Sequence, residues 1–120
     1  MFELTVRDEI SAAHFLRGYR GKCANLHGHT FRVAVTVAGE ALNDVGIMMD
    51  LVDMKKHLKA IIDRLDHVCL NDLEFFKANN PSSENLARYI YKEYKALIAP
   101  VRLVKVRIWE SSRADVIYYE

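Results

Sequence analysis

The sequence predicts an α+β domain in which a four-stranded antiparallel sheet packs against two helices. Apolar and polar residues alternate near both ends of the chain, as in half-buried strands, whereas apolar residues recur at helical spacing in the middle. Consecutive strands flanking consecutive helices indicate an antiparallel sheet with the order strand, strand, helix, helix, strand, strand (ββααββ). The 120 residues are expected to form one domain, residues 1–120, without a linker or repeat.

The first two strands are predicted over residues 2–10 and 29–38, because apolar side chains alternate with polar ones in both segments. His14 is expected just beyond the first strand. The second segment alternates most clearly, with its apolar positions at Phe31, Val33, Val35 and Val37. We therefore expect these two strands to form a pair with one face on the core.

Two helices are predicted after a loop over residues 39–46. The first spans 51–65, with Asp50 as its N-cap and a stripe of Met, Leu and Ile at helical spacing. After a loop over residues 73–81, Ser82 or Ser83 caps the second helix, which Pro100 ends. The apolar stripes predict that both helices pack on the sheet.

The last two strands are predicted over 101–109 and 116–119, joined by a turn over 110–115 into a hairpin. In the first of them Val104, Val106 and Ile108 are expected to face one side. A sheet of four strands has two unpaired edges, which predicts pairing with other subunits.

Composition excludes several classes of protein. Apolar residues make up 51% and charged residues 28% of the chain, which is typical of a globular domain. The net charge of +1, from 17 basic and 16 acidic residues, argues against nucleic acid as the partner. The sequence contains no apolar run long enough for a transmembrane helix and no signal-peptide pattern at residue 1, and two cysteines favour a reduced, cytoplasmic setting.

A potential metal site lies at the start of the second strand. His27 and His29 are separated only by Gly28, and residues i and i+2 of an extended chain project from the same face. With His14 they make three imidazoles, a set that binds zinc and leaves the fourth tetrahedral position open, as in catalytic sites. Cys23 lies four residues before His27. The alternative is that these are ordinary surface or core histidines.

Two other features have more than one interpretation. Arg17, Arg20 and Lys22 lie in a glycine-punctuated loop, which is either a solvated turn or a phosphate site. Asp66 beside His67 is either an acid–base pair or a helix end, where histidine is favoured by the C-terminal carbonyls.

A group of hydrogen-bond donors and one acceptor are candidates for substrate binding. The N-terminus of the second helix, near Ser82 and Ser83, offers free backbone N–H groups to a polar ligand. Glu110, at the end of a strand, is either solvated or able to accept two parallel N–H bonds from an amino-pyrimidinone.

These motifs together resemble the 6-pyruvoyl-tetrahydropterin synthase / 6-carboxytetrahydropterin synthase family over essentially the whole chain. Their order and separations match those of the family. The motifs are Ser11-Ala12-Ala13-His14, Cys23-x3-His27-Gly28-His29, Leu65-Asp66-His67 with Leu70-Asn71, Pro81-Ser82-Ser83-Glu84-Asn85-Leu86 and Trp109-Glu110. The gap of three residues between Cys23 and His27 looks more like the bacterial carboxytetrahydropterin branch, which acts in queuosine and deazapurine synthesis.

The resemblance implies a tunnelling fold in which sheets from three subunits join into a 12-stranded barrel and two trimers form a homohexamer. Active sites lie at subunit interfaces. It also implies site roles. The zinc (Zn2+) ligands are His14, His27 and His29; Cys23 is the catalytic thiol; Asp66 and His67 are its acid–base partners, from a neighbouring subunit; Glu110 and Ser83 bind the pterin.

The implied activity is that of a carbon–carbon lyase. The expected substrate is 7,8-dihydroneopterin triphosphate and the expected products are 6-carboxy-5,6,7,8-tetrahydropterin, acetaldehyde and triphosphate. Arg17, Arg20 and Lys22 are expected to contact the triphosphate. The alternatives are a 6-pyruvoyl-tetrahydropterin synthase or folate-pathway variant on the same scaffold, and a non-catalytic, zinc-stabilised pterin-binding module.

Overall fold

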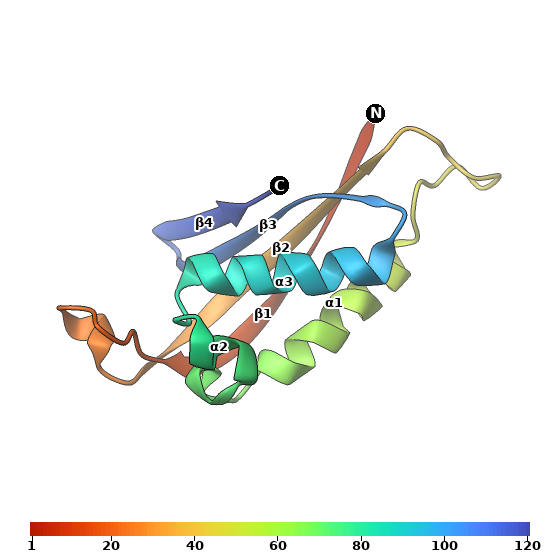
Figure 1. The fold of residues 1–120 in the computed structure, drawn as a ribbon. Helices are drawn as coiled ribbons and strands as arrows, with labels where there is room; N and C mark the ends of the chain where they lie inside the picture. Colours follow the sequence, from red (N-terminus) through yellow and green to blue (C-terminus); the bar gives the residue numbers. More distant parts are fainter.

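The computed structural model describes all 120 residues and has the predicted α+β architecture. Four antiparallel strands form one sheet in the order β1-β2-β3-β4, and two long helices lie across one face of it (Figure 1). The strands are β1 (Phe2–His14), β2 (His27–Gly39), β3 (Arg102–Ser111) and β4 (Ala114–Tyr118). The helices are α1 (Leu51–Leu65), α2 (Glu74–Ala78) and α3 (Ser83–Ile98), with single 3₁₀ turns η1 (Lys22–Ala24) and η2 (Leu70–Asp72).

The first two strands are longer than the alternation predicted. β1 continues to His14, and β2 begins at His27, so the two residues lie opposite each other at the end of the ladder. The expectation that His14 follows the strand was therefore wrong. The small residues of Ser11–Ala13 do not alternate in polarity, so the strand end could not be seen in the sequence.

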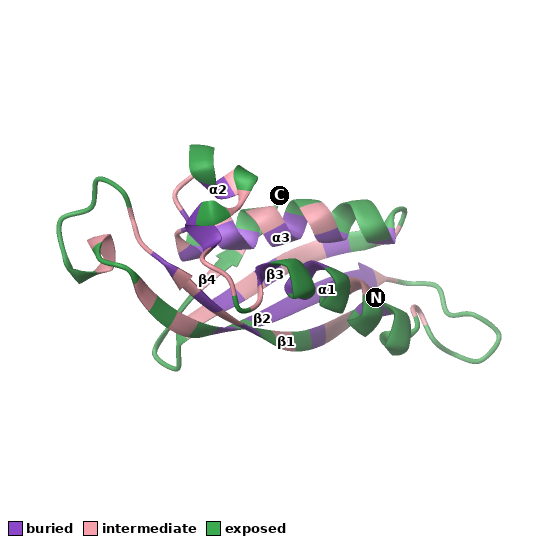
Figure 2. Cartoon of the chain, turned by 90° about the horizontal axis from the view of Figure 1, so that it is seen from below, coloured by how far each residue is buried: buried purple, intermediate pink, exposed green.

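The core lies between the sheet and the two long helices. Figure 2 shows the buried residues gathered where α1 and α3 face the strands. From β2 the core takes the alternating positions Phe31, Val33, Val35 and Val37, all with no exposed surface. The opposite face of the sheet has no helix against it.

Helix α1 has the predicted bounds, and the Asp50 side chain accepts a hydrogen bond from the Val52 amide at 2.8 Å. Helix α3 is capped by Ser82, which accepts from the Asn85 amide at 3.1 Å. The predicted loop over 73–81 was partly wrong, because five of its residues form α2, which buries Phe76.

The hairpin of β3 and β4 is longer and tighter than predicted, with β3 reaching Ser111 and β4 starting at Ala114. Between Thr36 and Val37 the β2–β3 register shifts by a bulge. As a result Leu103 is buried, whereas Val104, which was expected on the core face, is half-buried.

One sheet edge is partly covered and the other is open. The segment after α1 runs along β1: the His67 amide donates to the Ser11 carbonyl at 2.6 Å, and the Ala13 amide donates to the Val68 carbonyl at 3.0 Å. The first half of β1 and the outer side of β4 pair with no strand of this chain. Joining of sheets into a barrel therefore stays a prediction. No helix of the structure combines the length and the apolar character needed to span a membrane.

Candidate metal centre and active site

Three imidazoles meet at the end of the β1–β2 ladder. His14 ends β1, and His27 and His29 open β2 on the face that continues the core positions. The ring centroids lie 4.5 Å (His14–His27), 4.8 Å (His27–His29) and 5.2 Å (His14–His29) apart. The strand register therefore brings together the three residues that the sequence offered as metal ligands.

The hydrogen bonds of two of these rings determine which nitrogen faces the centre. The Nδ1 of His14 lies 2.7 Å from the Pro81 carbonyl oxygen, and the Nδ1 of His27 lies 2.6 Å from the Asn25 carbonyl oxygen. A carbonyl only accepts, so each Nδ1 carries a proton, and in the neutral ring the Nε2 presents the lone pair. Metal-bound histidines are oriented by carbonyls in the same way.

The Nε2 atoms of the three histidines are buried and have no hydrogen-bond partner. Such orphaned atoms are costly unless something else satisfies them. Burial is also the main cause that lowers the pKa of His14, which keeps that ring neutral. The donor set therefore fits a metal ion that accepts neutral imidazole, with zinc the most usual.

Glu110 is a fourth member of the cluster, and sequence reasoning did not place it there. Its Oε1 lies 3.0 Å from the Nε2 of His29, off the line of a hydrogen bond, and its Oε2 accepts from the Ser83 hydroxyl at 3.0 Å. One ligand atom from each of the four residues lies within 4.8 Å of the others. The carboxylate can thus approach either a metal or a ligand beside it.

Cys23 lies beside the histidines, in η1. A pocket of about 160 Å³ joins the metal cluster to this thiol and to the N-terminus of α3. Cys23 is half-buried and is a free thiol. The pocket is lined by His14, Leu16, Tyr19, Cys23, Ser82, Ser83, Glu84 and Glu110. Leu16, Tyr19 and Glu84 were not predicted to line this pocket. Leu16 and Tyr19 reach it through the fold of the loop, and Glu84 reaches it from the first turn of α3.

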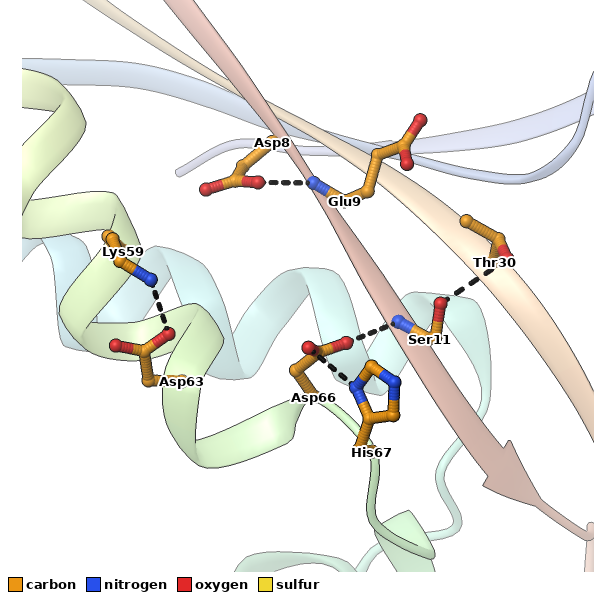
Figure 3. Close-up of polar contacts among 8 residues, drawn as sticks. All are labelled: Asp8, Glu9, Ser11, Thr30, Lys59, Asp63, Asp66 and His67. Carbon is orange, nitrogen blue, oxygen red and sulfur yellow. Dashed lines mark hydrogen bonds and ion pairs between the residues drawn. The ribbon is translucent and has the colours of Figure 1, made fainter.

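Asp66 and His67 form a pair at a different place in the chain. The His67 Nδ1 lies 2.7 Å from one oxygen of Asp66, and the other oxygen accepts from the Ser11 amide at 2.7 Å (Figure 3). The Ser11 amide is the main cause that lowers the pKa of Asp66, followed by His67. His67 is held at a positive φ of 59° and its side chain is 81% exposed.

His67 lines a groove of about 520 Å³ along β1 and β2, together with His29 but without Cys23. Within one chain the Cys23 thiol and the His67 ring therefore line separate hollows.

The basic loop splits into two parts. The Arg17 guanidinium donates to the Phe76 carbonyl at 2.6 Å, and the Arg17 backbone exchanges two hydrogen bonds with the Asn80 side chain at 3.0 and 2.8 Å. Arg17 therefore fastens the loop to α2, a role that the sequence did not reveal. Arg20 and Lys22 are exposed and make no ion pair.

Relatives of this chain are found across bacteria, archaea and animals. The chain is 38% identical over 102 residues to the 6-carboxy-5,6,7,8-tetrahydropterin synthase of Bacillus subtilis, covering 81% of this chain and 68% of the relative. It is 35% identical over 120 residues to a putative 6-pyruvoyl tetrahydrobiopterin synthase of Caenorhabditis elegans, covering 88% and 86%. The human 6-pyruvoyl tetrahydrobiopterin synthase is 37% identical over 102 residues, covering 82% and 70%.

Solved structures agree with these sequence matches. The 6-pyruvoyl tetrahydropterin synthase of Caenorhabditis elegans superimposes with a TM-score of 0.91 at 32% identity, covering 99% of this chain and 95% of that one. A Plasmodium vivax 6-pyruvoyltetrahydropterin synthase shares the fold, with a TM-score of 0.75 at 19% identity, covering 99% and 97%. The sequence profile of the 6-pyruvoyl tetrahydropterin synthases matches residues 3–120, and the chain belongs to this family.

Proposed function

We propose that the chain is a zinc-dependent lyase that converts 7,8-dihydroneopterin triphosphate into 6-carboxy-5,6,7,8-tetrahydropterin, acetaldehyde and triphosphate. The observation that carries the proposal is the convergence of three buried, unsatisfied Nε2 atoms beside the free thiol of Cys23. A structural zinc site closes with four protein ligands and needs no thiol outside its ligand set. A set of three histidines with an open side suits catalysis.

Zinc is the proposed metal, and His14, His27 and His29 would hold it. When bound, it would supply Lewis-acid polarisation of a substrate oxygen. The Pro81 and Asn25 carbonyls keep two of the rings in the tautomer that such binding needs. Glu110 and Ser83 would bind the amino-pyrimidinone edge of the pterin, since a carboxylate accepts two parallel N–H bonds.

Proton transfer would be carried out by Cys23 and by the Asp66–His67 pair. Cys23, as thiolate, would act as a general base on the substrate side chain. His67 would act as a general acid, oriented through its Nδ1 by the Asp66 carboxylate. Because the two groups line separate hollows of one chain, we infer that His67 reaches the thiol of a neighbouring subunit.

Two points favour the carboxy branch. The Bacillus subtilis relative named as a 6-carboxy-5,6,7,8-tetrahydropterin synthase is 38% identical, and three residues separate Cys23 from His27. We accordingly propose a role in queuosine or deazapurine synthesis, in a cytoplasmic homohexamer. Relatives named as 6-pyruvoyl enzymes are nearly as similar, so a 6-pyruvoyl-tetrahydropterin synthase is the second candidate.

The test is product analysis of the zinc-loaded protein with 7,8-dihydroneopterin triphosphate by mass spectrometry. We expect acetaldehyde and 6-carboxytetrahydropterin. Cys23→Ala should lower turnover by about 10²–10⁴-fold, the usual contribution of a general base, while zinc content is kept. Cys69→Ala, which removes the other free thiol, is the matched control and should stay active.

Other outcomes would reassign the protein. A product with an intact three-carbon side chain would favour the 6-pyruvoyl candidate and reject the carboxy branch. If the zinc-loaded wild type returns the substrate unchanged, the catalytic proposal is rejected and a pterin-binding module is the remaining hypothesis.

A further inference from the structure

The face of the sheet that carries no helix has a hollow of its own. This hollow, of about 350 Å³, is lined by Arg7, Asp8, Glu9, Arg32 and Trp109. Glu110 follows Trp109 in β3, and successive strand residues point to opposite faces, so the hollow and the metal cluster lie on opposite sides of the sheet. Nothing in the proposed reaction uses these residues.

The strand register explains why a hollow forms here. One row across the sheet reads Glu9, Arg32, Trp109 and Asp115, from β1 to β4. The next row on the same face reads Arg7, Ala34, Arg107 and Ile117. Ala34 is thus a small residue among long ones, and it is only 4% exposed because its neighbours surround it.

Three arginines are neighbours of this alanine in the sheet. Arg7 and Arg107 are its neighbours across the ladder, and Arg32 lies two residues before it on β2. Neighbours across strands are about 5 Å apart and same-face residues of one strand about 7 Å apart. Arg7 and Arg32, which both line the hollow, can therefore reach one small ligand above Ala34.

The three arginines differ in their partners. Arg107 is fixed, since its Nε donates to Asp115 at 2.6 Å and its guanidinium lies 4.3 Å from the centroid of the Trp109 ring. Arg7 and Arg32 make no ion pair and no side-chain hydrogen bond, although Glu9 is the direct neighbour of Arg32. Figure 3 shows the carboxylates of Asp8 and Glu9 directed to opposite sides of β1.

We propose that this hollow is a binding site for a small oxyanion, a phosphate or carboxylate group held by Arg7 and Arg32 over Ala34. The planar guanidinium fork matches two oxygens of such a group. Arg107, paired with Asp115, holds the Trp109 ring as one wall. The site is independent of the metal cluster and of the proposed reaction.

Trp109 is the only tryptophan in the chain, so its fluorescence reports directly on the hollow. The test is titration of the intact protein with pyrophosphate, and separately with citrate, followed by Trp109 fluorescence and by equilibrium dialysis with labelled anion. We expect saturable binding. A preference for pyrophosphate or for citrate will tell whether the natural ligand carries phosphate or carboxylate.

Two variants and a matched control decide the assignment. Arg32→Gln and, separately, Arg7→Gln should each weaken binding about tenfold or more, the usual cost of losing a charge-assisted hydrogen bond. Arg32→Lys keeps the charge but loses the planar guanidinium fork, so its affinity for the anion should lie between those of the Gln variants and the wild type. Arg102→Gln removes the same group about 16 Å along β3 from Arg107, on the same face of the sheet because the bulge pairs Arg102 with Ala38. This variant should bind the anion within twofold of the wild type.

Absence of saturable binding by dialysis would overturn the proposal. So would equal weakening by Arg102→Gln, which would indicate a diffuse positive surface. Binding that Arg32→Gln and Arg7→Gln leave unchanged would place the anion elsewhere, for instance at the metal cluster, and would also reject the site. None of these results depends on turnover, so the proposal can fail while the proposed lyase stands, and the reverse.

Discussion

At the residue scale, two carbonyl oxygens organise the metal cluster. Pro81, before α3, and Asn25, before β2, each accept from an Nδ1–H and so turn an Nε2 lone pair inward on His14 and His27. Backbone carbonyls orient these two rings, whereas carboxylates orient many other metal-bound histidines. The Glu110 carboxylate is consequently free to lie inside the cluster, beside His29 and Ser83.

Asp66 should make the stability of the protein depend on pH in the acidic range. The Ser11 amide and His67 lower the pKa of Asp66 in the folded state. A carboxyl whose pKa is lowered by folding stabilises the protein at pH values above its pKa in the unfolded chain, near 3.8. This stabilisation is lost as the pH falls through the pKa of the folded state. Asp66→Asn should be less stable than the wild type at pH 6 and should lose less stability between pH 6 and pH 3.

The measurement is urea unfolding at a series of pH values. Asp44→Asn, at an exposed loop position without a side-chain hydrogen bond or ion pair, is the control and should follow the wild type. Parallel pH curves for Asp66→Asn and the wild type would show that the Ser11 contact does not favour the ionised carboxylate.

At the element scale, α3 both supports the core and delivers groups to the site. Its N-terminus supplies Ser83 to Glu110, and the residue before its cap, Pro81, holds His14. Farther along, Tyr94 is fully buried and donates a hydrogen bond to the Met54 carbonyl of α1 at 3.1 Å. This bond fixes α3 against α1 and thus helps to fix the site.

Tyr94 should make the protein sensitive to alkali. Burial raises the pKa of Tyr94 from 10.0 to about 12. A raised pKa means that the neutral phenol is favoured in the folded state, so its stabilisation is complete below pH 10 and is lost as the pH rises from 10 towards 12. About 2–3 kcal/mol of unfolding free energy should disappear over this interval, at about 1.4 kcal/mol per pKa unit.

Tyr94→Phe should lower the free energy of unfolding by about 1 kcal/mol at pH 8, because the hydrogen bond is lost. The variant should not show the further decrease in stability that ionisation of Tyr94 causes at alkaline pH. Urea unfolding at pH 8 and pH 11.5 measures both effects. Tyr119→Phe, which changes a phenol that is 70% exposed, is the control. The same alkaline loss in Tyr94→Phe as in the wild type would contradict the argument.

How far the sequence predicted each element depended on local signals. Helix α1 was predicted with its observed bounds because Asp50 caps it and its apolar positions repeat regularly. Helix α2 was missed because a helix of five residues shows too little periodicity. The bulge that exchanges Leu103 for Val104 is a property of the β2–β3 pairing, which one strand alone does not encode.

Prediction of the site also depended on local signals in the sequence. His27 and His29 were correctly placed on one face from their spacing, and His14 joins them through strand pairing. The approach of Glu110 to His29 requires the register between β2 and β3, and the contacts of Arg17 require the fold of α2. Interactions across distant segments were therefore recovered only from the structure.

At the scale of the whole molecule, Cys23 and His67 line different hollows of a single chain. The unpaired outer sides of β1 and β4 offer edges through which copies can associate. Association would bring the groove of one chain to the thiol pocket of another.

Mixing two inactive variants tests this arrangement. Cys23→Ala and His67→Ala chains, unfolded and refolded together at equal amounts, should regain about a quarter of the wild-type turnover, because about a quarter of the interfaces then combine an intact Cys23 with an intact His67. Each variant refolded alone should stay inactive. No recovery in the mixture, with mixed oligomers shown by native mass spectrometry, would place both groups of one site in the same chain.

The most direct test of the account is to measure turnover against zinc content. The metal-free protein, prepared with a chelator, should not release acetaldehyde from 7,8-dihydroneopterin triphosphate, and activity should return in proportion to zinc up to one ion per chain. His27→Ala should bind zinc far more weakly, whereas His57→Ala, on α1, should match the wild type. Full turnover by the metal-free protein, or zinc binding that survives His27→Ala unchanged, would contradict the central claim that the three histidines form a catalytic metal site.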